Sequence, residues 1–276
     1  MSATVEAWSG KDRGDENFPV ASALIAPHLR RHVHAFYAFA RNADDIADSA
    51  ELTADDKIAR LDVMEAVLLG AREDGAPSAL ALRASLAETG VTPRHSTDLL
   101  IAFRRDATKL RYANWDELLD YCRFSAMPVG RHVLDLHGEN TDTYPSNDAL
   151  CASLQVLNHL QDCAKDLAQL DRCYLPQDVL TASGGATEDL RGHAETPALR
   201  QTFNALLDRV DALNAQADGL PAHTKSRRLR LETAVIVGLA RRLAKRLRHG
   251  DPLATRVKLR KLDAAASMIT ALRFLP

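Results

Sequence analysis

The sequence lacks any long hydrophobic run. The longest purely apolar stretch near its C-terminus, Ala234–Ala240, has seven residues, whereas a helix that crosses a bilayer needs about 20. The first fifteen residues have neither the basic start nor the apolar segment of a secretory signal. We therefore expect a cytoplasmic protein in which residues 1–16 form a flexible N-terminal arm.

Cysteine is scarce, and glycine forms no nucleotide-binding fingerprint. The chain has 4 cysteines and no CxxC pair, so neither a zinc site nor a disulfide framework is indicated and reduced thiols are expected. The pair Gly184-Gly185 lies in an expected loop with no strand before it, so NADPH is not predicted. The cysteines are Cys122, Cys151, Cys163 and Cys173.

Charge is distributed unevenly, although the net charge is only -2. Residues 225–276 contain 14 of the 35 Lys and Arg but 3 of the 37 acidic residues, which leaves 21 basic and 34 acidic residues for the remainder. This basic tail has two interpretations: helices that carry their charges into water, or a surface in peripheral contact with anionic lipid headgroups on the inner face of a membrane. Nucleic acid is not predicted, because the basic stretches have no interleaved aromatic residues.

Apolar residues recur at three- and four-residue spacing through most of the chain, which predicts helices nearly throughout and no sheet. Gly70–Pro77, Gly138–Pro145 and 171–197 interrupt this pattern, and the last of these is long enough to form a lid. No repeat of fixed period is present, so one domain is expected. The expected helices are 28–49, 54–69, 78–88, 93–109, 115–136, 146–169, 198–218, 226–248 and one from 262.

Aspartate pairs at i and i+4 place two carboxylates on one helical face, where an oxygen-preferring cation such as Mg²⁺ can bind together with substrate phosphates. Three such pairs occur: Asp44/Asp48, Asp116/Asp120 and Asp162/Asp166. Chance alone gives roughly two in a chain of this composition. The spacing is therefore weak evidence by itself, and we interpret Asp116/Asp120 as a surface pair.

The surroundings of the other two pairs are more informative, because each lies in a narrow polar stripe opposite an apolar face. Ordinary solvated faces would give the same pattern. However, solvated faces usually carry Lys and Glu, whereas these stripes carry shorter or more rigid hydrogen-bonding groups. Like charges one turn apart also destabilise a helix unless a cation lies between them. The stripes are His34, Tyr37, Arg41, Asp44, Asp45 and Asp48, and Gln155, Asn158, His159, Asp162, Asp166 and Gln169.

The same two segments resemble the aspartate-rich motifs of the squalene and phytoene synthase family. They read YAFARNADDIAD over 37–48 and QVLNHLQDCAKD over 155–166. Further matching segments extend the resemblance from about residue 15 to 265. The resemblance implies that residues 17–276 form a single-domain, all-α isoprenoid synthase bundle with a central cavity, which acts on an isoprenoid diphosphate with Mg²⁺.

Within the family, segments 15–22 and 158–166 resemble the bacterial hydroxysqualene synthases of hopanoid pathways. These enzymes convert presqualene diphosphate and water to hydroxysqualene and diphosphate. The chain departs from the squalene and phytoene synthase pattern at 125–130, which reads SAMPVG, and Pro128 is expected to kink its helix there. This altered wall favours a pocket that handles only the second half-reaction, the conversion of presqualene diphosphate. It does not favour a pocket that condenses two farnesyl diphosphates.

The resemblance assigns roles to individual residues. Asp44, Asp48, Asp162 and Asp166 are expected to bind the metal, and Tyr121 matches the tyrosine at the reacting centre. Independently of the resemblance, a carbocation must be kept from bulk water by apolar and aromatic groups, and Phe36 and Phe124 are expected to line the cavity for this reason. Charge-assisted hydrogen bonds to the diphosphate are expected from basic side chains. The expected substrate-binding residues are Asn17, Tyr37, Arg41, Gln155, Asn158, Lys165 and Arg172.

Two alternatives share these features. A squalene- or phytoene-type synthase that joins two prenyl diphosphates would need the same aspartates. A helical scaffold without catalytic activity would have the same fold, although such a protein is expected to have lost metal ligands, and all four aspartates are present here.

Overall fold

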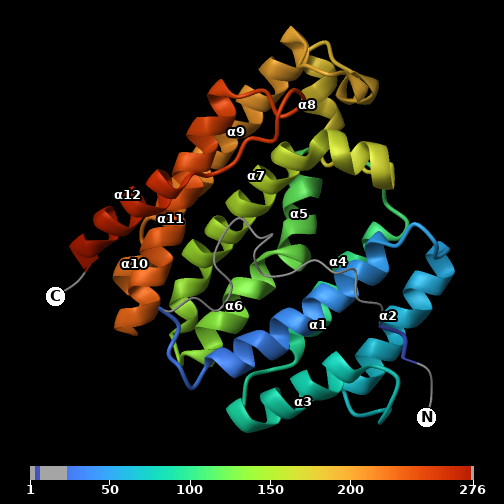
Figure 1. The fold of residues 1–276 in the computed structure, drawn as a ribbon, viewed down its shortest axis with the longest axis vertical. Coiled ribbons are helices and arrows are strands. Elements are labelled where there is room, and N and C mark those ends of the chain that lie inside the picture. The colour runs from blue at the N-terminus through green and yellow to red at the C-terminus, as the bar shows by residue number, and fades with distance from the viewer. Residues whose placement is uncertain (1–3, 7–23, 275–276) are drawn as a thin grey trace.

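The computed structural model describes residues 4–6 and 24–274. These residues form helices joined by short connections, and no strand occurs among them (Figure 1). The expectation of an all-α fold is therefore confirmed. The helices are α1 Arg30–Asp48, α2 Ala54–Leu68, α3 Pro77–Thr89, α4 Arg94–Asp106, α5 Trp115–Ser125, α6 Met127–Leu136, η2 Thr141–Thr143, α7 Tyr144–Leu170, α8 Gln177–Ala182, η3 Thr187–Arg191, α9 Pro197–Ala217, α10 Leu220–His223, α11 Arg227–His249, α12 Lys261–Ala271 and η4 Leu272–Phe274.

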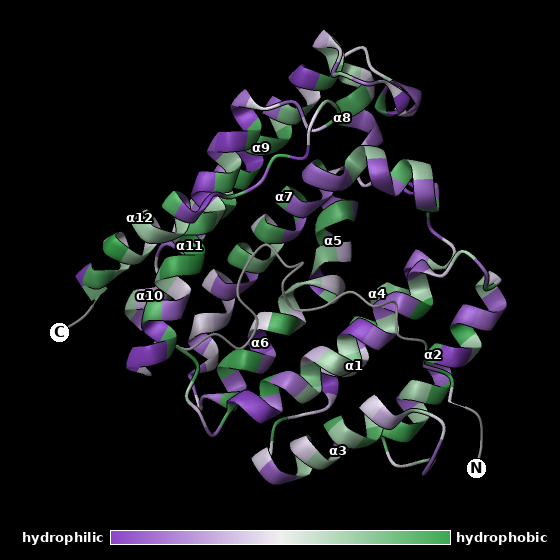
Figure 2. Cartoon of the chain, in the orientation of Figure 1, coloured by the Kyte–Doolittle hydropathy of each residue, from purple (hydrophilic) through white to green (hydrophobic). Residues whose placement is uncertain are grey.

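Helix α7 lies at the centre of the molecule and packs against α5, α6, α9 and α11 (Figure 1). On the other side, α1 packs against α2, α3 and α4. Apolar and polar residues alternate along the helices (Figure 2), and the buried apolar side chains of most helices join in one large core. The two helices that carry the aspartate pairs thus belong to opposite halves of one core.

Local sequence signals fix several helix ends. The side chains of Thr53, Asn114 and Thr196 accept hydrogen bonds from the backbone N–H groups of Asp56, Glu117 and Leu199, which caps the starts of α2, α5 and α9. Gly90 ends α3 with a φ of 72°, a conformation that glycine adopts without strain. These capping residues explain why the expected and observed boundaries of most helices agree closely.

The expected helix over 115–136 is wrong as a single element. It breaks at Ala126, whose φ of −127° and ψ of −47° are not helical, and α6 begins with Pro128 in its first turn. Proline is tolerated there because the first N–H groups of a helix have no partner within it. The kink expected at Pro128 is therefore a complete break between α5 and α6.

Segment 171–197 is not one open loop. It contains α8 and η3, and the residues from Arg172 to Pro176 are buried. Near the other end of the chain, Val5 donates a backbone hydrogen bond to Gly75 and Glu6 accepts one from Ser78. The rest of the expected arm lies outside the described residues. No described helix has the combination of length and apolar composition that crossing a bilayer requires.

Candidate active site

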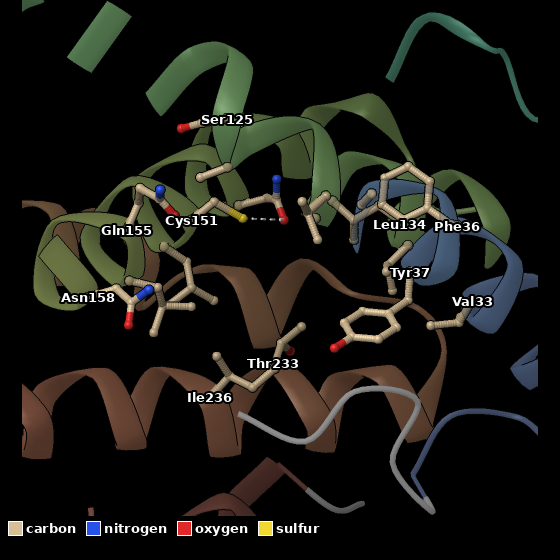
Figure 3. Close-up of a pocket in the computed structure, with 18 of the residues that line it drawn as sticks. Val33, Phe36, Tyr37, Ser125, Leu134, Cys151, Gln155, Asn158, Thr233 and Ile236 are labelled. Carbon is tan, nitrogen blue, oxygen red and sulfur yellow. Dashed lines mark hydrogen bonds between the residues drawn. The ribbon is translucent and has the colours of Figure 1, made fainter. Parts of the chain in front are cut away.

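A cavity of about 380 Å³ lies between α1, α4, α5, α6, α7, α10 and α11, a volume within the range of about 300–1,000 Å³ typical of small-molecule sites. In Figure 3, Phe36 and Tyr37 project from α1 on one side, Gln155 and Asn158 from α7 on the other, and Ile236 from α11. Most other lining side chains are apolar. The expected central cavity is therefore present.

Phe36 lines this cavity as expected, whereas Phe124 does not. The ring of Phe124 instead lies 4.5 Å from the guanidinium carbon of Arg105. Phe103 of α4 contributes an aromatic wall in its place. Behind Phe36, the ring of His132 stacks at 3.9 Å between centroids.

The cavity runs along both aspartate helices toward their C-terminal ends. Its lining extends from Val33 to Asp44 on α1 and from Asn147 to Asn158 on α7. Asp48, Asp162 and Asp166 follow within about two turns on the same helices. Carbonyl groups at helix C-termini carry partial negative charge, which adds to that of the carboxylates. One end of an otherwise apolar cavity therefore meets a strongly acidic region.

Arginine side chains pair with three of the four aspartates. Arg41 contacts Asp44 at 3.1 Å and Arg256 contacts Asp162 at 3.0 Å. Arg172, which is buried, donates to Asp48 at 2.6 Å. Lys165 is exposed on α7. In the described part of the chain, no three His, Cys, Asp or Glu side chains are grouped closely enough to hold a metal ion.

Asp166 differs from the other three aspartates. No hydrogen bond or ion pair joins its carboxylate to another described residue. Burial, together with the like charges of Asp162 and Asp48, raises the pKa of Asp166 to about 7. This effect of Asp48 shows that the carboxylates of α1 and α7 face a common region. Carboxylate oxygens are the ligands that a hard divalent cation prefers, and such a cation would offset the repulsion, but the described side chains would have to move closer together to hold it.

Asp106, at the end of α4, organises the groups around Tyr121. It accepts hydrogen bonds from the hydroxyls of Tyr121 at 2.7 Å and Tyr174 at 2.9 Å. Its backbone oxygen accepts from Arg172, which also binds Asp48. Burial raises the pKa of Asp106 to about 6 and that of Tyr121 well above its usual range. Tyr121 is therefore a neutral phenol, held by a buried carboxyl that is connected to the acidic region.

Aromatic rings surround this pair. Tyr174 stacks on His159 with 3.7 Å between centroids, and Tyr112 lies 5.3 Å from Tyr121. Burial lowers the pKa of His159 to about 3, so its imidazole is neutral at physiological pH. His159 also contacts Gln155 at 3.2 Å. Tyr121 is thus packed among buried aromatic rings and neutral polar groups on the side away from the cavity lining.

The wall formed by α6 depends on Gly130. A Cβ atom at this position would lie 2.0 Å from Oδ1 of Asn147 and 2.7 Å from Sγ of Cys151. Only glycine therefore permits α6 and α7 to approach so closely beside the cavity.

Two polar residues of α11 also line the cavity, Glu232 and Thr233, and both are buried. A buried carboxylate in a largely apolar wall is unusual, because a charged group loses hydration there. Neither residue was among the expected site residues, since α11 has no aspartate motif. Asn17, which was expected to contact substrate, lies outside the described residues.

The fold and the cavity define a class of protein: an all-helical protein with a largely apolar central cavity that ends beside paired carboxylates and arginines. The family model described as squalene/phytoene synthase matches residues 11–263. The chain therefore belongs to the squalene/phytoene synthase family.

Relatives within this family are similar over most of their length. A hydroxysqualene synthase from Rhodopseudomonas palustris is 51% identical over 263 residues, which cover 95% of this chain and 90% of the relative. One from Sinorhizobium fredii is 49% identical over 90% of this chain and 85% of the relative. The crystal structure of squalene synthase HpnC from Alicyclobacillus acidocaldarius has 32% identity and a TM-score of 0.75, with 86% of this chain and 90% of that chain covered.

Proposed function

We propose that this protein is a hydroxysqualene synthase, which converts presqualene diphosphate and water into hydroxysqualene and diphosphate. The observation that carries the proposal is the apolar cavity that runs along α1 and α7 to an acidic end. Such a cavity suits a substrate with a long hydrocarbon part and one charged group. The names of the 51% and 49% identical relatives support the particular reaction.

The acidic end would bind the diphosphate together with Mg²⁺. Asp44, Asp48, Asp162 and Asp166 are the residues that would hold the metal, in competition with the arginines now paired to three of them. When bound, Mg²⁺ supplies positive charge that stabilises the departing diphosphate. Arg41, Lys165 and Arg172 are the basic groups that would add hydrogen bonds to phosphate oxygens.

The apolar wall and Tyr121 would protect the carbocation left after diphosphate departs. Phe36 and Phe103 line the cavity, where they would exclude bulk water and where aromatic rings can attract a cation. Tyr121 lines the same cavity and donates its hydroxyl proton to Asp106, so its ring and oxygen lone pairs remain available to the cation. Since Tyr121 stays neutral, it stabilises the cation without forming a bond to it.

Capture by water requires a group that orients the water molecule and accepts its proton. Glu232 is the candidate, since it is a buried carboxylate in the cavity wall. The water oxygen would bond to the cationic carbon, and one of its protons would pass to Glu232. The C–O bond to the diphosphate is broken and one C–O bond to water is formed, so water replaces diphosphate. Enzymes of this kind are classed with the carbon–oxygen lyases.

Product analysis separates this proposal from condensation. Purified protein is incubated with Mg²⁺ and either presqualene diphosphate or farnesyl diphosphate. We expect hydroxysqualene from presqualene diphosphate and little product from farnesyl diphosphate. Efficient condensation of farnesyl diphosphate alone would instead support the squalene- or phytoene-type alternative, and no turnover of either substrate would support a non-catalytic scaffold.

A further inference from the structure

Helix α12 and Leu272, the residue that follows it at the start of η4, direct large apolar side chains away from the protein. Leu262 is 79% exposed, Ile269 69%, Leu272 51% and Met268 41%. At 100° per residue these four lie within one arc of about 120° on the helix surface. Of the large apolar residues that are exposed in the described part of the chain, most are therefore gathered on this one helix face.

The buried face of α12 is small and polar. Asp263, Ser267 and Ala271 face α11. Nε of Arg246 donates to Asp263 at 2.7 Å, and Nε of Arg242 donates to Ser267 at 3.1 Å. These hydrogen bonds fix the rotation of α12 about its axis. The outward position of its leucines and isoleucine thus follows from specific contacts with α11.

Close packing reinforces this orientation. A Cβ atom at Gly238 of α11 would lie 3.0 Å from Oγ of Ser267, so the two helices meet through small residues. The opposite side of α11, at Glu232 and Ile236, lines the cavity. Helix α11 therefore lines the cavity on one side and packs against α12 on the other; Figure 1 shows α12 beside α11 at the edge of the molecule.

Positive charge surrounds the apolar face. Lys258, Arg260, Lys261 and Arg273 are all exposed. The acidic residues of this region do not neutralise them, because Glu232 is buried, Asp263 is bound to Arg246 and Asp251 accepts backbone hydrogen bonds from Glu195 and Leu253. Two copies of such a face would repel each other, whereas an anionic lipid surface would attract it.

We propose that α12 docks on an anionic lipid bilayer. Leu262, Met268, Ile269 and Leu272 enter the boundary of headgroups and acyl chains, and the surrounding Lys and Arg side chains contact the lipid phosphates. One reason to infer membrane docking rests on the proposed function, because a C30 substrate and its product dissolve in bilayers. The docked protein would hold the α11 wall of its cavity close to the membrane.

Vesicle flotation tests this surface. The full chain is mixed with vesicles of phosphatidylcholine alone or with phosphatidylglycerol added. We expect flotation with the anionic vesicles, weakening as salt is raised. Leu262→Glu with Ile269→Glu should lower the partition coefficient at least about tenfold, because two large apolar side chains no longer leave water. Lys258→Glu with Lys261→Glu should lower binding to anionic vesicles only.

Leu69→Glu is the matched control, since Leu69 is a leucine at the end of α2 that is 54% exposed; it should float like the parent. The proposal is overturned if the parent floats with neither vesicle, or if the Leu262/Ile269 variant floats as the parent does. It is also overturned if sedimentation shows a dimer that this variant dissociates while flotation is unchanged. Turnover of presqualene diphosphate in detergent micelles should be the same for all variants. If the parent does not turn over presqualene diphosphate, the proposed function is refuted, whereas the conclusion on docking is unaffected.

Discussion

Replacing Asp48 and Asp166 separately by asparagine should change stability in opposite directions in metal-free buffer. Asp48 accepts a hydrogen bond at 2.6 Å from Arg172, which is buried. Hydrogen bonds to charged groups contribute about 1.5–3 kcal/mol, so Asp48→Asn should lower the free energy of unfolding by roughly that amount. Asp166 has no cation in contact with it among the described residues, and it is repelled by Asp162 and Asp48.

The sign of the Asp166 effect follows from its pKa, which is raised from 3.8 to about 7 in the folded protein. Ionisation then costs the folded state free energy, and this cost is absent below about pH 4 and complete above about pH 7. A shift of one pKa unit between the folded and unfolded states corresponds to about 1.4 kcal/mol. Because the carboxylate is partly exposed and water screens it, we expect Asp166→Asn to stabilise the protein by about 1–2 kcal/mol at pH 8 and not at all at pH 4.

Urea denaturation in EDTA at pH 8 and pH 4 measures both effects, with Asp116→Asn as the control from the surface pair. Adding Mg²⁺ and inorganic diphosphate should raise the Tm of the parent, since a ligand that binds only the folded state stabilises it, but should raise that of Asp166→Asn much less. If Asp166→Asn were destabilised at pH 8 as strongly as Asp48→Asn, the electrostatic account of the acidic end would be wrong.

Three further substitutions test the cavity. Tyr121→Phe should keep kcat within about tenfold of the parent, because the ring remains to face the cation. It should lower the free energy of unfolding by about 1–2 kcal/mol, because Asp106 loses a hydrogen-bond donor. Equal losses of kcat for Tyr121→Phe and Tyr121→Ala would contradict the role given to the ring. Gly130→Ala should lower the urea midpoint by the equivalent of about 1–3 kcal/mol, because its Cβ would collide with Asn147, and an unchanged midpoint would contradict it. Glu232→Gln should shift products from hydroxysqualene toward hydrocarbons formed by proton loss, as measured by gas chromatography, and an unchanged product ratio would exclude Glu232 as the proton acceptor.

The sequence predicted the helical class and most helix boundaries, because apolar periodicity and capping residues are local signals. Its main error in the fold, the single helix over 115–136, arose at Ala126, where nothing but the following Pro128 marks a break. Ala126 lines the cavity, so this local error concerned part of its wall. Phe124 was also expected in the cavity wall, because a carbocation needs aromatic surroundings, whereas the structure places Phe103 there.

The aspartate helices could be identified because each motif lies within one helix. Asp106 could not, because its partners Tyr121 and Tyr174 are 15 and 68 residues away in the chain, and no local pattern links them. The role of Arg172 in joining Asp48 to Asp106 likewise depends on packing between distant segments. The outward face of α12 was unpredictable for the same reason, since Arg246 and Arg242 of α11 decide which side is buried.

The central claim is that water captures the carbocation inside the cavity. The most direct measurement is turnover of presqualene diphosphate with Mg²⁺ in water enriched in ¹⁸O, followed by mass spectrometry of the extracted product. The account predicts hydroxysqualene that carries one ¹⁸O atom, in proportion to the enrichment of the solvent. A hydrocarbon product, or an alcohol whose oxygen does not come from the solvent, would contradict it.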